Sequence, residues 1–295
     1  MPELPEIETI KNQLQKLVVG KKIKAVEIFL PKIIKAPVKV FRKTVENAII
    51  ERISRRAKIL IIELNNGWRL LIHLKLTGQL IYQKKDCHPE PPAGGEGSKR
   101  FFASLRTTKK EYKYTHIIYT FSDGSKLFHN DLRQFGYVKL IETTEAEKFL
   151  EKDFGPEPLN KDFTIDVFRA ILKKRPKARI KQFLMDQKNI AGIGNIYSDE
   201  ILFFAGVHPL CRDSGLKDAE ARKIFQGIKK ILTLAIKHKG TSARDYIDVY
   251  GRKGTFEKLL KVYGRKGEKC IKCKNIIKRI KVGGRSAHFC SNCQR

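Results

Sequence analysis

The sequence predicts an α+β protein with an N-terminal helix and β-sandwich, followed by a helical domain that ends in a four-cysteine β-hairpin. Short β-branched runs separated by turn residues dominate up to about residue 150, and apolar residues recur at helical spacing from about residue 162. Four of the six cysteines form two close pairs near the C-terminus. The 295 residues suffice for domains with separate cores, and we divide the chain into residues 1–150, 151–240 and 241–295.

The first element is an amphipathic helix predicted over residues 5–19. Gly20 follows it as a C-terminal stop. Its apolar residues recur three or four positions apart and form one face, namely Ile7, Ile10, Leu14, Leu17 and Val18.

A β-sandwich of roughly 110 to 140 residues is predicted next. Turn residues at 65–67 and 123–124 separate its runs of β-branched residues, which cover 23–29, 57–64, 68–82 and 115–121. Between two of these strands, the segment that starts at Cys87 is rich in Pro and Gly, so it is predicted to be a surface insertion.

Helical periodicity begins after Gly155-Pro-Glu-Pro158, which we interpret as the hinge between the two halves. Phe163, Val167, Phe168, Ile171 and Leu172 form one predicted helix face, and Ile180, Phe183 and Leu184 form another. A third, regular helix is predicted over residues 217–238, with Gly240 as its stop.

The charge favours a polyanionic partner. The chain has 61 Lys and Arg against 31 Asp and Glu, a net charge of +30. A highly charged solvated surface would spread this excess evenly, but residues 252–295 hold 14 cationic and 2 acidic residues. Nucleic acid is the first candidate, because neutralising each phosphate releases counterions.

A membrane location is not expected. No apolar run approaches the ~18 to 20 residues that span a bilayer. The start Met-Pro-Glu-Leu-Pro-Glu lacks the basic and apolar pattern of a secretory signal. We therefore expect a cytosolic protein, in which metal ligation of cysteines is favoured over disulfides.

The paired cysteines predict one structural zinc ion. Cys270-x2-Cys273, sixteen residues and Cys290-x2-Cys293 match the four-cysteine zinc spacing, and four thiolates close a tetrahedron without an open position. Gly283-Gly284 between them predicts a hairpin turn. Four unligated thiols are the alternative.

The second residue offers a nucleophile. If the initiator Met1 is removed, Pro2 becomes the terminus and carries a free secondary amine. An α-amino group has a reference pKa of about 7.7 to 8.0, so part of it is unprotonated at neutral pH.

Together these features resemble the formamidopyrimidine-DNA glycosylase family from end to end. The resemblance rests on six motifs in the same order: the start Met-Pro-Glu-Leu-Pro-Glu, His73-Leu-x-Leu-Thr-Gly78, Asp131-Leu-Arg-Gln-Phe-Gly136, Gly155-Pro-Glu-Pro-Leu159, Asp186-Gln187 with Ala191 to Glu200, and the finger from Gly283-Gly-Arg285 to Gln294. It implies a helix–two-turn–helix domain in residues 151–240 and a lesion-recognition loop at about Gly240–Thr255, before the zinc finger.

The resemblance also implies the activity. Family enzymes excise oxidised purines such as 8-oxoguanine from DNA and cut the strand at the abasic site. It implies Pro2 as the nucleophile that attacks C1′ and Glu3 as the general acid, although Glu3 could also simply complement a helix dipole. The resemblance further implies that Lys58 binds a phosphate and assists β-elimination, and that Arg285 binds phosphates and assists δ-elimination.

Six further residues are implied to bind DNA. Arg133 contacts the cytosine whose partner base has been extruded, and Phe135 inserts into the neighbouring base step, unless Phe135 belongs to the core. Asn195 lies at the turn of the helix–two-turn–helix motif, with a plain helix cap as the alternative. The others are Lys177, Leu76, which stands where the family has methionine, and His73, which could instead be a satisfied core histidine.

Where many members have a DNA-contacting histidine, this chain has Tyr114, to which we do not transfer that contact.

We expect a monomer of bacterial type that associates with the nucleoid and acts on double-stranded DNA with oxidised bases or abasic sites. Three alternatives remain: a sister enzyme for oxidised pyrimidines, an inactive damage-binding protein, and an RNA-binding zinc ribbon. Pro2, Glu3, Lys58 and Arg285 argue against an inactive protein, and an RNA-binding ribbon would leave Pro2 and Glu3 without a purpose.

Overall fold

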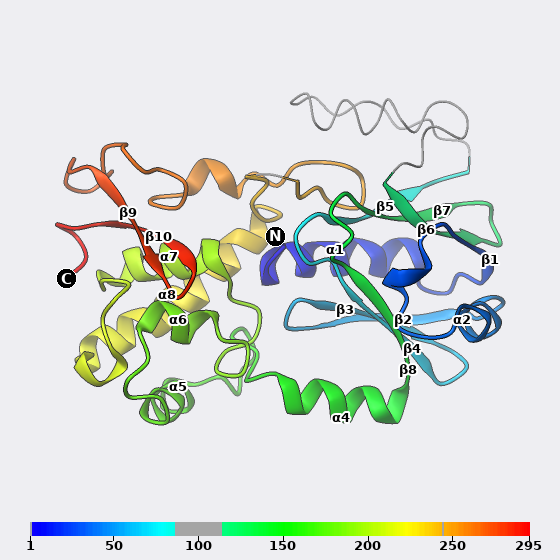
Figure 1. Ribbon diagram of the computed structural model, residues 1–295, viewed down its shortest axis with the longest axis horizontal. Helices are drawn as coiled ribbons and strands as arrows, with labels where there is room; N and C mark the ends of the chain where they lie inside the picture. The colour runs from blue at the N-terminus through cyan, green and yellow to red at the C-terminus, as the bar shows by residue number, and fades with distance from the viewer. Residues whose placement is uncertain (1, 86–113, 244) are drawn as a thin grey trace. The chain divides into compact units, whose positions relative to one another are not determined.

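A computed structural model describes residues 2–85, 114–243 and 245–295 of the protein (Figure 1). The insertion predicted from Cys87 lies outside the described residues. The described chain forms two compact units. The first contains Pro2 and the described parts of 6–149 and 239–255, and the second contains residues 3–5, 150–238 and 256–295.

The first unit contains the predicted helix and β-sandwich. Helix α1 spans Leu4–Val18. One antiparallel sheet has the order β1-β6-β7-β5, with bounds Ile23–Ile28, Thr115–Phe121, Lys126–Asp131 and Gly78–Gln83. The other has the order β2-β3-β4-β8, with bounds Ile50–Arg56, Ile59–Leu64, Trp68–His73 and Tyr137–Glu142.

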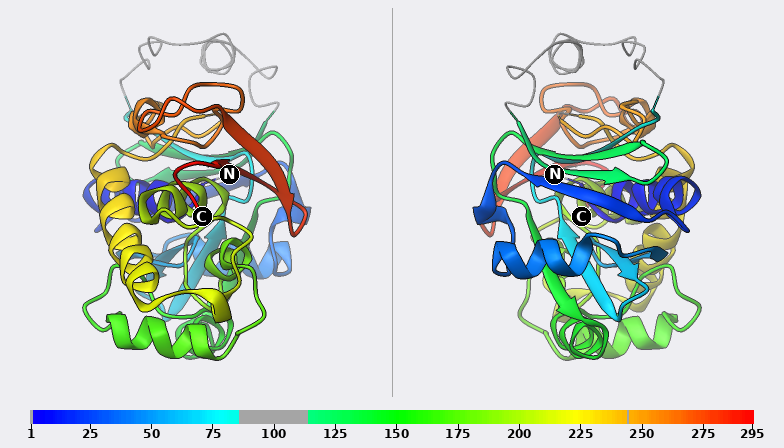
Figure 2. Two further views of the ribbon diagram at one scale, coloured as in Figure 1. Left: turned by 90° about the vertical axis from the view of Figure 1, so that its left-hand side faces the viewer. Right: turned by 90° about the vertical axis from the view of Figure 1, so that its right-hand side faces the viewer.

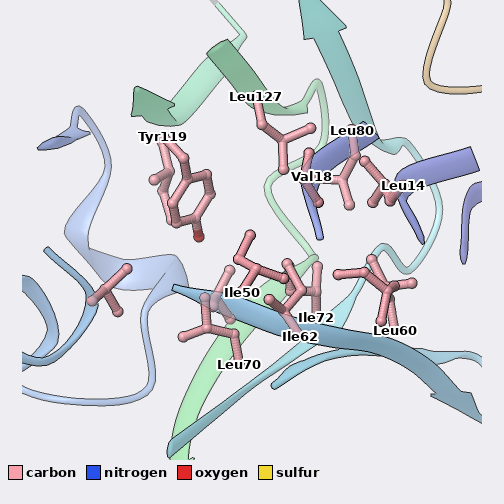
Figure 3. Close-up of a cluster of buried hydrophobic side chains, with 14 of the residues drawn as sticks. Leu14, Val18, Ile50, Leu60, Ile62, Leu70, Ile72, Leu80, Tyr119 and Leu127 are labelled. Atoms are coloured by element: carbon pink, nitrogen blue, oxygen red, sulfur yellow. The ribbon is translucent and has the colours of Figure 1, made fainter. Parts of the chain in front are cut away.

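The core of this unit lies between the two sheets (Figure 3). Leu80, Tyr119 and Leu127 of the first sheet face Ile50, Ile62 and Ile72 of the second, and Leu14 and Val18 of α1 extend the same cluster. The residues that a strand contributes to this core alternate along it, as Leu60, Ile62 and Leu64 do in β3, because successive side chains point to opposite faces of the sheet. Burial of each such side chain stabilises the fold by about 1.5–3 kcal/mol.

Several elements of the first unit were not predicted. Strand β2 carries four charged residues in seven, and only Ile50 and Ile53 are fully buried, so it has no apolar run. Helix α2 (Val38–Val45) and the 3₁₀ turn Pro31–Ile33 are short, and strands β7 and β8 also lie outside the predicted runs. The run predicted over 68–82 is two strands, because a turn at residues 74–77 separates β4 from β5.

The second unit is helical. Helix α4 (Thr143–Asp153) leads into it, followed by α5 (Ile165–Lys173), α6 (Ile180–Met185), α7 (Asn195–Ala205) and α8 (Asp218–Lys237). Helix α7 packs along α8 (Figures 1 and 2). Val167, predicted on the inner face of α5, is exposed instead. No helix in the described part of the chain is long and apolar enough to cross a membrane.

Helix α7 was not predicted as an element because it is buried on nearly all sides, with polar as well as apolar residues inside. Apart from its first residue and Phe204, every residue of α7 is buried. A helix without a polar face shows no amphipathic period, which is the pattern that predicts helices from sequence.

The predicted C-terminal hairpin is present. Strand β9 (Ile277–Val282) pairs antiparallel with β10 (Arg285–Cys290), at the red end of the chain in Figure 2. Gly283 and Gly284 have φ of 53° and 78°, which is the conformation of a tight two-residue hairpin turn. The structure therefore confirms the predicted fold class.

Several polar residues of the sandwich are buried, and a histidine is among them. His129 of β7 lies opposite Leu80 and Ile117 and is fully buried. Its two ring nitrogens make no hydrogen bond with any described residue. Burial lowers the pKa of His129 to about 4, assisted by His116 and opposed by Asp131.

This histidine predicts a loss of stability in acid. The unfolded chain protonates His129 near pH 6.5 and the folded chain only near pH 4. Stability is therefore unaffected above pH 6.5 and falls between pH 6.5 and 4, by about 3 kcal/mol from this residue. Urea unfolding at several pH values should show a smaller decline for His129→Leu than for the wild type. Parallel curves for the two proteins would contradict this assignment.

Candidate active site and zinc centre

The N-terminus of α7 holds the carboxylate of Glu3. Gly194 is the N-cap residue and has no side chain to cap the helix. Instead, Glu3 Oε1 accepts a hydrogen bond from the backbone N–H of Ile196 at 2.8 Å, and Oε2 accepts one from Tyr197 at 3.4 Å. A carboxylate at this position also complements the helix dipole. Glu3 is 1% exposed, so the contact is buried.

Glycines make room for this contact. A Cβ atom on Gly194 would lie 2.3 Å from Cδ of Glu3. Gly192 has φ of +87°, its Cβ would lie 2.6 Å from Leu4, and its carbonyl accepts from the N–H of Leu4 at 3.0 Å. The two glycines thus allow close contacts that fix Glu3 and Leu4, directly after Pro2 in the chain. Pro2 is itself buried.

Asn195 is the first residue of α7, and capping is performed by Glu3. The side-chain Oδ1 of Asn195 is buried and has no hydrogen-bond partner among the described residues. The interpretation of Asn195 as a plain helix cap is therefore not what the geometry shows.

A buried lysine lies close to the same helix. Lys181 of α6 is fully buried and forms an ion pair with the carboxylate of Asp199. Burial lowers the pKa of Lys181, and the negative charges of Asp199 and Glu3 oppose this shift. Sequence patterns do not reveal Lys181, because lysine is almost never fully buried unless it is paired, and its partner lies on a different helix.

Lys58 lies in the tight turn between β2 and β3. Arg56 pairs with Ile59, so Ala57 and Lys58 are the two turn residues, and Ala57 has φ of 54°. The guanidinium of Arg55 donates to the carbonyl of Ala57 at 2.9 Å and to Glu8 at 2.9 Å. Lys58 is 7% exposed, so the turn holds its side chain largely out of solvent.

His73 is a neutral imidazole in the same unit. Burial lowers the pKa of His73 to about 3, and the positive charges of Lys75 and Lys58 add to the shift. Its Nδ1 accepts from the N–H of Lys75 at 3.0 Å, which leaves the proton on Nε2. His73 is only half-buried, so it is not a residue of the sandwich core.

Two loops with predicted DNA-inserting residues are joined by Asp131. Its carboxylate accepts from the hydroxyl of Thr77, next to Leu76, and from the N–H of Gly136 at 2.7 Å. The N–H of Arg133 donates to Thr77 Oγ1 at 3.0 Å. One side chain therefore fixes both loops.

The second of these loops presents an aromatic ring to solvent. Phe135 is 53% exposed, and the guanidinium of Arg133 lies 4.8 Å from its ring centroid. Phe135 is therefore not a core residue. Leu76, on the other loop, is half-buried.

The segment Gly240–Thr255 is anchored on α1. Glu6 accepts from the N–H of Thr241 at 2.7 Å. Gln13 donates to Asp248 at 2.7 Å and accepts from the N–H of Val249 at 3.1 Å. These contacts fix the start and the middle of the predicted recognition loop within the first unit.

The remaining predicted DNA-binding residues of the second unit are exposed. Lys177 lies in the turn between α5 and α6, beside the exposed Lys173, Lys174 and Arg175. Arg285 begins β10, directly after the hairpin turn.

The four cysteines form a site that fits zinc. The ligand atoms of Cys270, Cys273, Cys290 and Cys293 all lie within 4.8 Å of one another. The Sγ atoms are 3.9 Å apart in Cys270–Cys293 and 3.4 Å apart in Cys273–Cys290. A tetrahedron with Zn–S bonds of ~2.3 Å has edges of about 3.8 Å. The donor set is complete, so the zinc ion is structural.

Comparisons with known proteins agree with this geometry. Residues 1–138 match the model of the formamidopyrimidine-DNA glycosylase N-terminal domain, and residues 154–246 match the H2TH domain of the same enzyme. Residues 267–295 match the zinc finger found in FPG and IleRS. The formamidopyrimidine-DNA glycosylase of Carboxydothermus hydrogenoformans is 41% identical over the full length of both chains.

The chain belongs to the formamidopyrimidine-DNA glycosylase family.

Solved structures of the family have the same fold. Lactococcus lactis Fpg in complex with DNA that contains an abasic site is 35% identical, with a TM-score of 0.85 and 99% of each chain covered. The wild-type L. lactis enzyme with N7-benzyl-Fapy-dG DNA is 36% identical, with a TM-score of 0.85 and 100% of each chain covered. The family thus accounts for the sandwich, the H2TH helices and the zinc finger of this enzyme.

The structure brings predicted residues together within each unit. Lys58 lies near His73, and the loops of Leu76 and Arg133 are joined, while Glu3 meets the turn that contains Asn195. Sequence reasoning missed the residues that hold them, which are Glu6, Asp131, Lys181, Asp199 and Glu200. Asp131 had a signal, because an Asp that begins a turn closed by glycine often bonds to the turn's own backbone.

The capping contact predicts that Gly194→Ala impairs catalysis. The new Cβ would displace the Glu3 carboxylate, since the two groups would lie 2.3 Å apart. We expect the single-turnover rate of base excision to fall by about 100-fold, the scale that a displacement of about 1 Å at an active site costs. The control is Gly215→Ala, whose Cβ would meet nothing within 4 Å. Equal rates for the two variants would contradict the placement.

The zinc site predicts one metal ion per chain. Native mass spectrometry should show one zinc in the wild type and none in Cys273→Ser, because three thiolates bind zinc more weakly than four. Cys211→Ser is the matched control, since Cys211 lies outside the cluster. Zinc retained at full occupancy in Cys273→Ser would show that the cluster is not the site.

Proposed function

We propose that this family enzyme excises oxidised purines, namely 8-oxoguanine and formamidopyrimidines, from duplex DNA and then cuts the strand by β,δ-elimination. The observation that carries the proposal is the buried Glu3 carboxylate, which α7 holds one residue from Pro2. A nucleophile and an acid that are adjacent in the chain are the minimal set for this chemistry.

Pro2 is the proposed nucleophile. After removal of Met1, its nitrogen attacks C1′ of the damaged nucleotide, the glycosidic bond breaks, and the base leaves. The resulting iminium withdraws electrons from the sugar and makes the C2′ proton acidic. The 3′ phosphate and then the 5′ phosphate can therefore leave by successive eliminations.

Glu3 is the proposed general acid. Its carboxyl group protonates the ring oxygen of the sugar and later moves the elimination proton. The N–H groups of Ile196 and Tyr197 orient it for both steps. The helix-dipole role and the catalytic role are compatible, because a capping contact fixes the position that catalysis requires.

Lys58 and Arg285 are the proposed phosphate ligands. The β2–β3 turn presents Lys58 near the neutral His73, so His73 adds no like charge, and its Nε2–H is available for a phosphate oxygen. Arg285 has a planar guanidinium that suits two phosphate oxygens, and its exposure on the hairpin supports this role. Lys177 and the N-terminal turn of α7 at Asn195 are proposed to bind the backbone of the same duplex.

Arg133, Phe135 and Leu76 are the proposed inserting residues. An extruded base leaves a gap in the stack that apolar side chains can fill. The exposure of Phe135 supports this role, since a ring that inserts between bases must be accessible, and Phe135 is 53% exposed. The guanidinium stacked on the ring would then address the orphaned cytosine.

Oxidised pyrimidines are the second candidate substrate class. A complex of wild-type L. lactis FPG with oxidised-pyrimidine DNA, at 36% identity, favours considering them. We place purines first because the Arg133 and Phe135 arrangement resembles that of the purine enzymes. We further propose that the enzyme acts as a monomer on chromosomal DNA in the cytoplasm, where that substrate lies.

The proposal predicts a covalent complex at Pro2. Borohydride reduction with an 8-oxoguanine:cytosine duplex should trap an adduct, which mass mapping places on the nitrogen of Pro2. A chain extended by one residue before Pro2 is the control and should form none, because its proline nitrogen is an amide. An adduct on a lysine, or none in the wild type, would refute the mechanism.

A further inference from the structure

Helix α7 carries two adjacent buried carboxylates that the mechanism does not use. Asp199 is 1% exposed and Glu200 is 2% exposed. Buried carboxylates are costly unless they are paired, so their partners indicate what they do. Both bind the zinc-finger region of the second unit.

Asp199 binds strand β10. Its Oδ2 accepts from the backbone N–H of His288 at 2.9 Å and lies 3.0 Å from Nδ1 of the same residue. The other side of the carboxylate is paired with the buried Lys181. The ring of His288 also packs edge-on against Tyr263, with 5.1 Å between centroids.

Glu200 binds the segment that leads into the finger. Its carboxylate accepts from the backbone N–H groups of Lys261, Val262 and Tyr263 at 2.9 to 3.1 Å. Tyr263 therefore connects the two carboxylates, because Glu200 holds its backbone and its ring contacts the histidine that Asp199 holds.

A third contact lies at the tip of the hairpin. A Cβ atom on Gly283 would lie 2.2 Å from Nε2 of Gln182, so the turn lies directly beside this side chain of α6. Gln182 directly follows Lys181, the partner of Asp199. The hairpin thus lies beside α6 at its tip and is bound along β10 by α7.

We propose that Asp199 is a positioning residue that sets the place of Arg285 through His288. Arg285 lies three residues from His288 on β10, about 10 Å along a strand that pairing keeps stiff. A displacement of β10 away from α7 therefore moves the guanidinium of Arg285 away from the 5′ phosphate, which is the group that leaves in δ-elimination. This inference rests on the proposed function, in which Arg285 assists δ-elimination.

The test measures the ratio of δ- to β-elimination products on an abasic duplex for Asp199→Asn and His288→Phe. Asp199→Asn also alters the environment of Lys181 and Glu3, whereas His288→Phe keeps the Lys181–Asp199 pair and an aromatic ring against Tyr263. Ser286→Ala is the matched control, because Ser286 lies on the same strand and its side chain contacts Arg279 rather than α7.

We expect the ratio to fall by about ten-fold or more in Asp199→Asn and by a smaller factor in His288→Phe, as displacement of a catalytic group predicts. Zinc content and borohydride trapping should stay at the wild-type level in both, and Ser286→Ala should keep the wild-type ratio.

Three results would overturn the inference: an unchanged ratio in Asp199→Asn, a change in Asp199→Asn with none in His288→Phe, or loss of zinc from both variants. The second would show that Asp199 acts through Lys181, and the third that it only maintains the finger. Failure of the proposed function is seen separately, because the wild type would then form no trapped adduct.

Discussion

The buried hydrogen bond between the Glu3 carboxylate and the N–H of Ile196 is the interaction on which the rest of the site depends. A hydrogen bond to a charged group contributes about 1.5–3 kcal/mol, and the dipole of α7 adds to it. It fixes a segment two residues from a chain end, which would otherwise be free to move. It also explains Gly194, because no other residue leaves room for the carboxylate.

Helix α7 can serve as this anchor because it is itself fixed. Almost all of its residues are buried, and its two carboxylates bind the finger region through backbone N–H groups. Removing one partner of a buried ion pair such as Lys181–Asp199 costs about 3–5 kcal/mol. One buried helix therefore holds Glu3 at its N-terminus and the finger hairpin at its middle.

Much of the fold could be predicted from the sequence, since α1, α8 and the zinc hairpin follow from periodicity, glycine stops and cysteine spacing. Helix α7 and strand β2 could not, because α7 lacks a polar face and β2 lacks an apolar run. Pro2, Glu3 and the cysteines stand in motifs that the sequence displays. Asp199 and Glu200 act on backbone N–H groups of distant segments, and sequence spacing does not reveal such contacts.

Amide hydrogen exchange at Ile196 tests the central claim most directly. In the wild type this N–H donates to Glu3 and should be protected. In Glu3→Ala the donor loses its acceptor, and its exchange should accelerate by about ten-fold or more, the equivalent of the lost hydrogen bond. The amide of Val262, which donates to Glu200, should keep its rate and serves as the internal reference. Equal protection of Ile196 in both proteins would show that the carboxylate does not rest on α7.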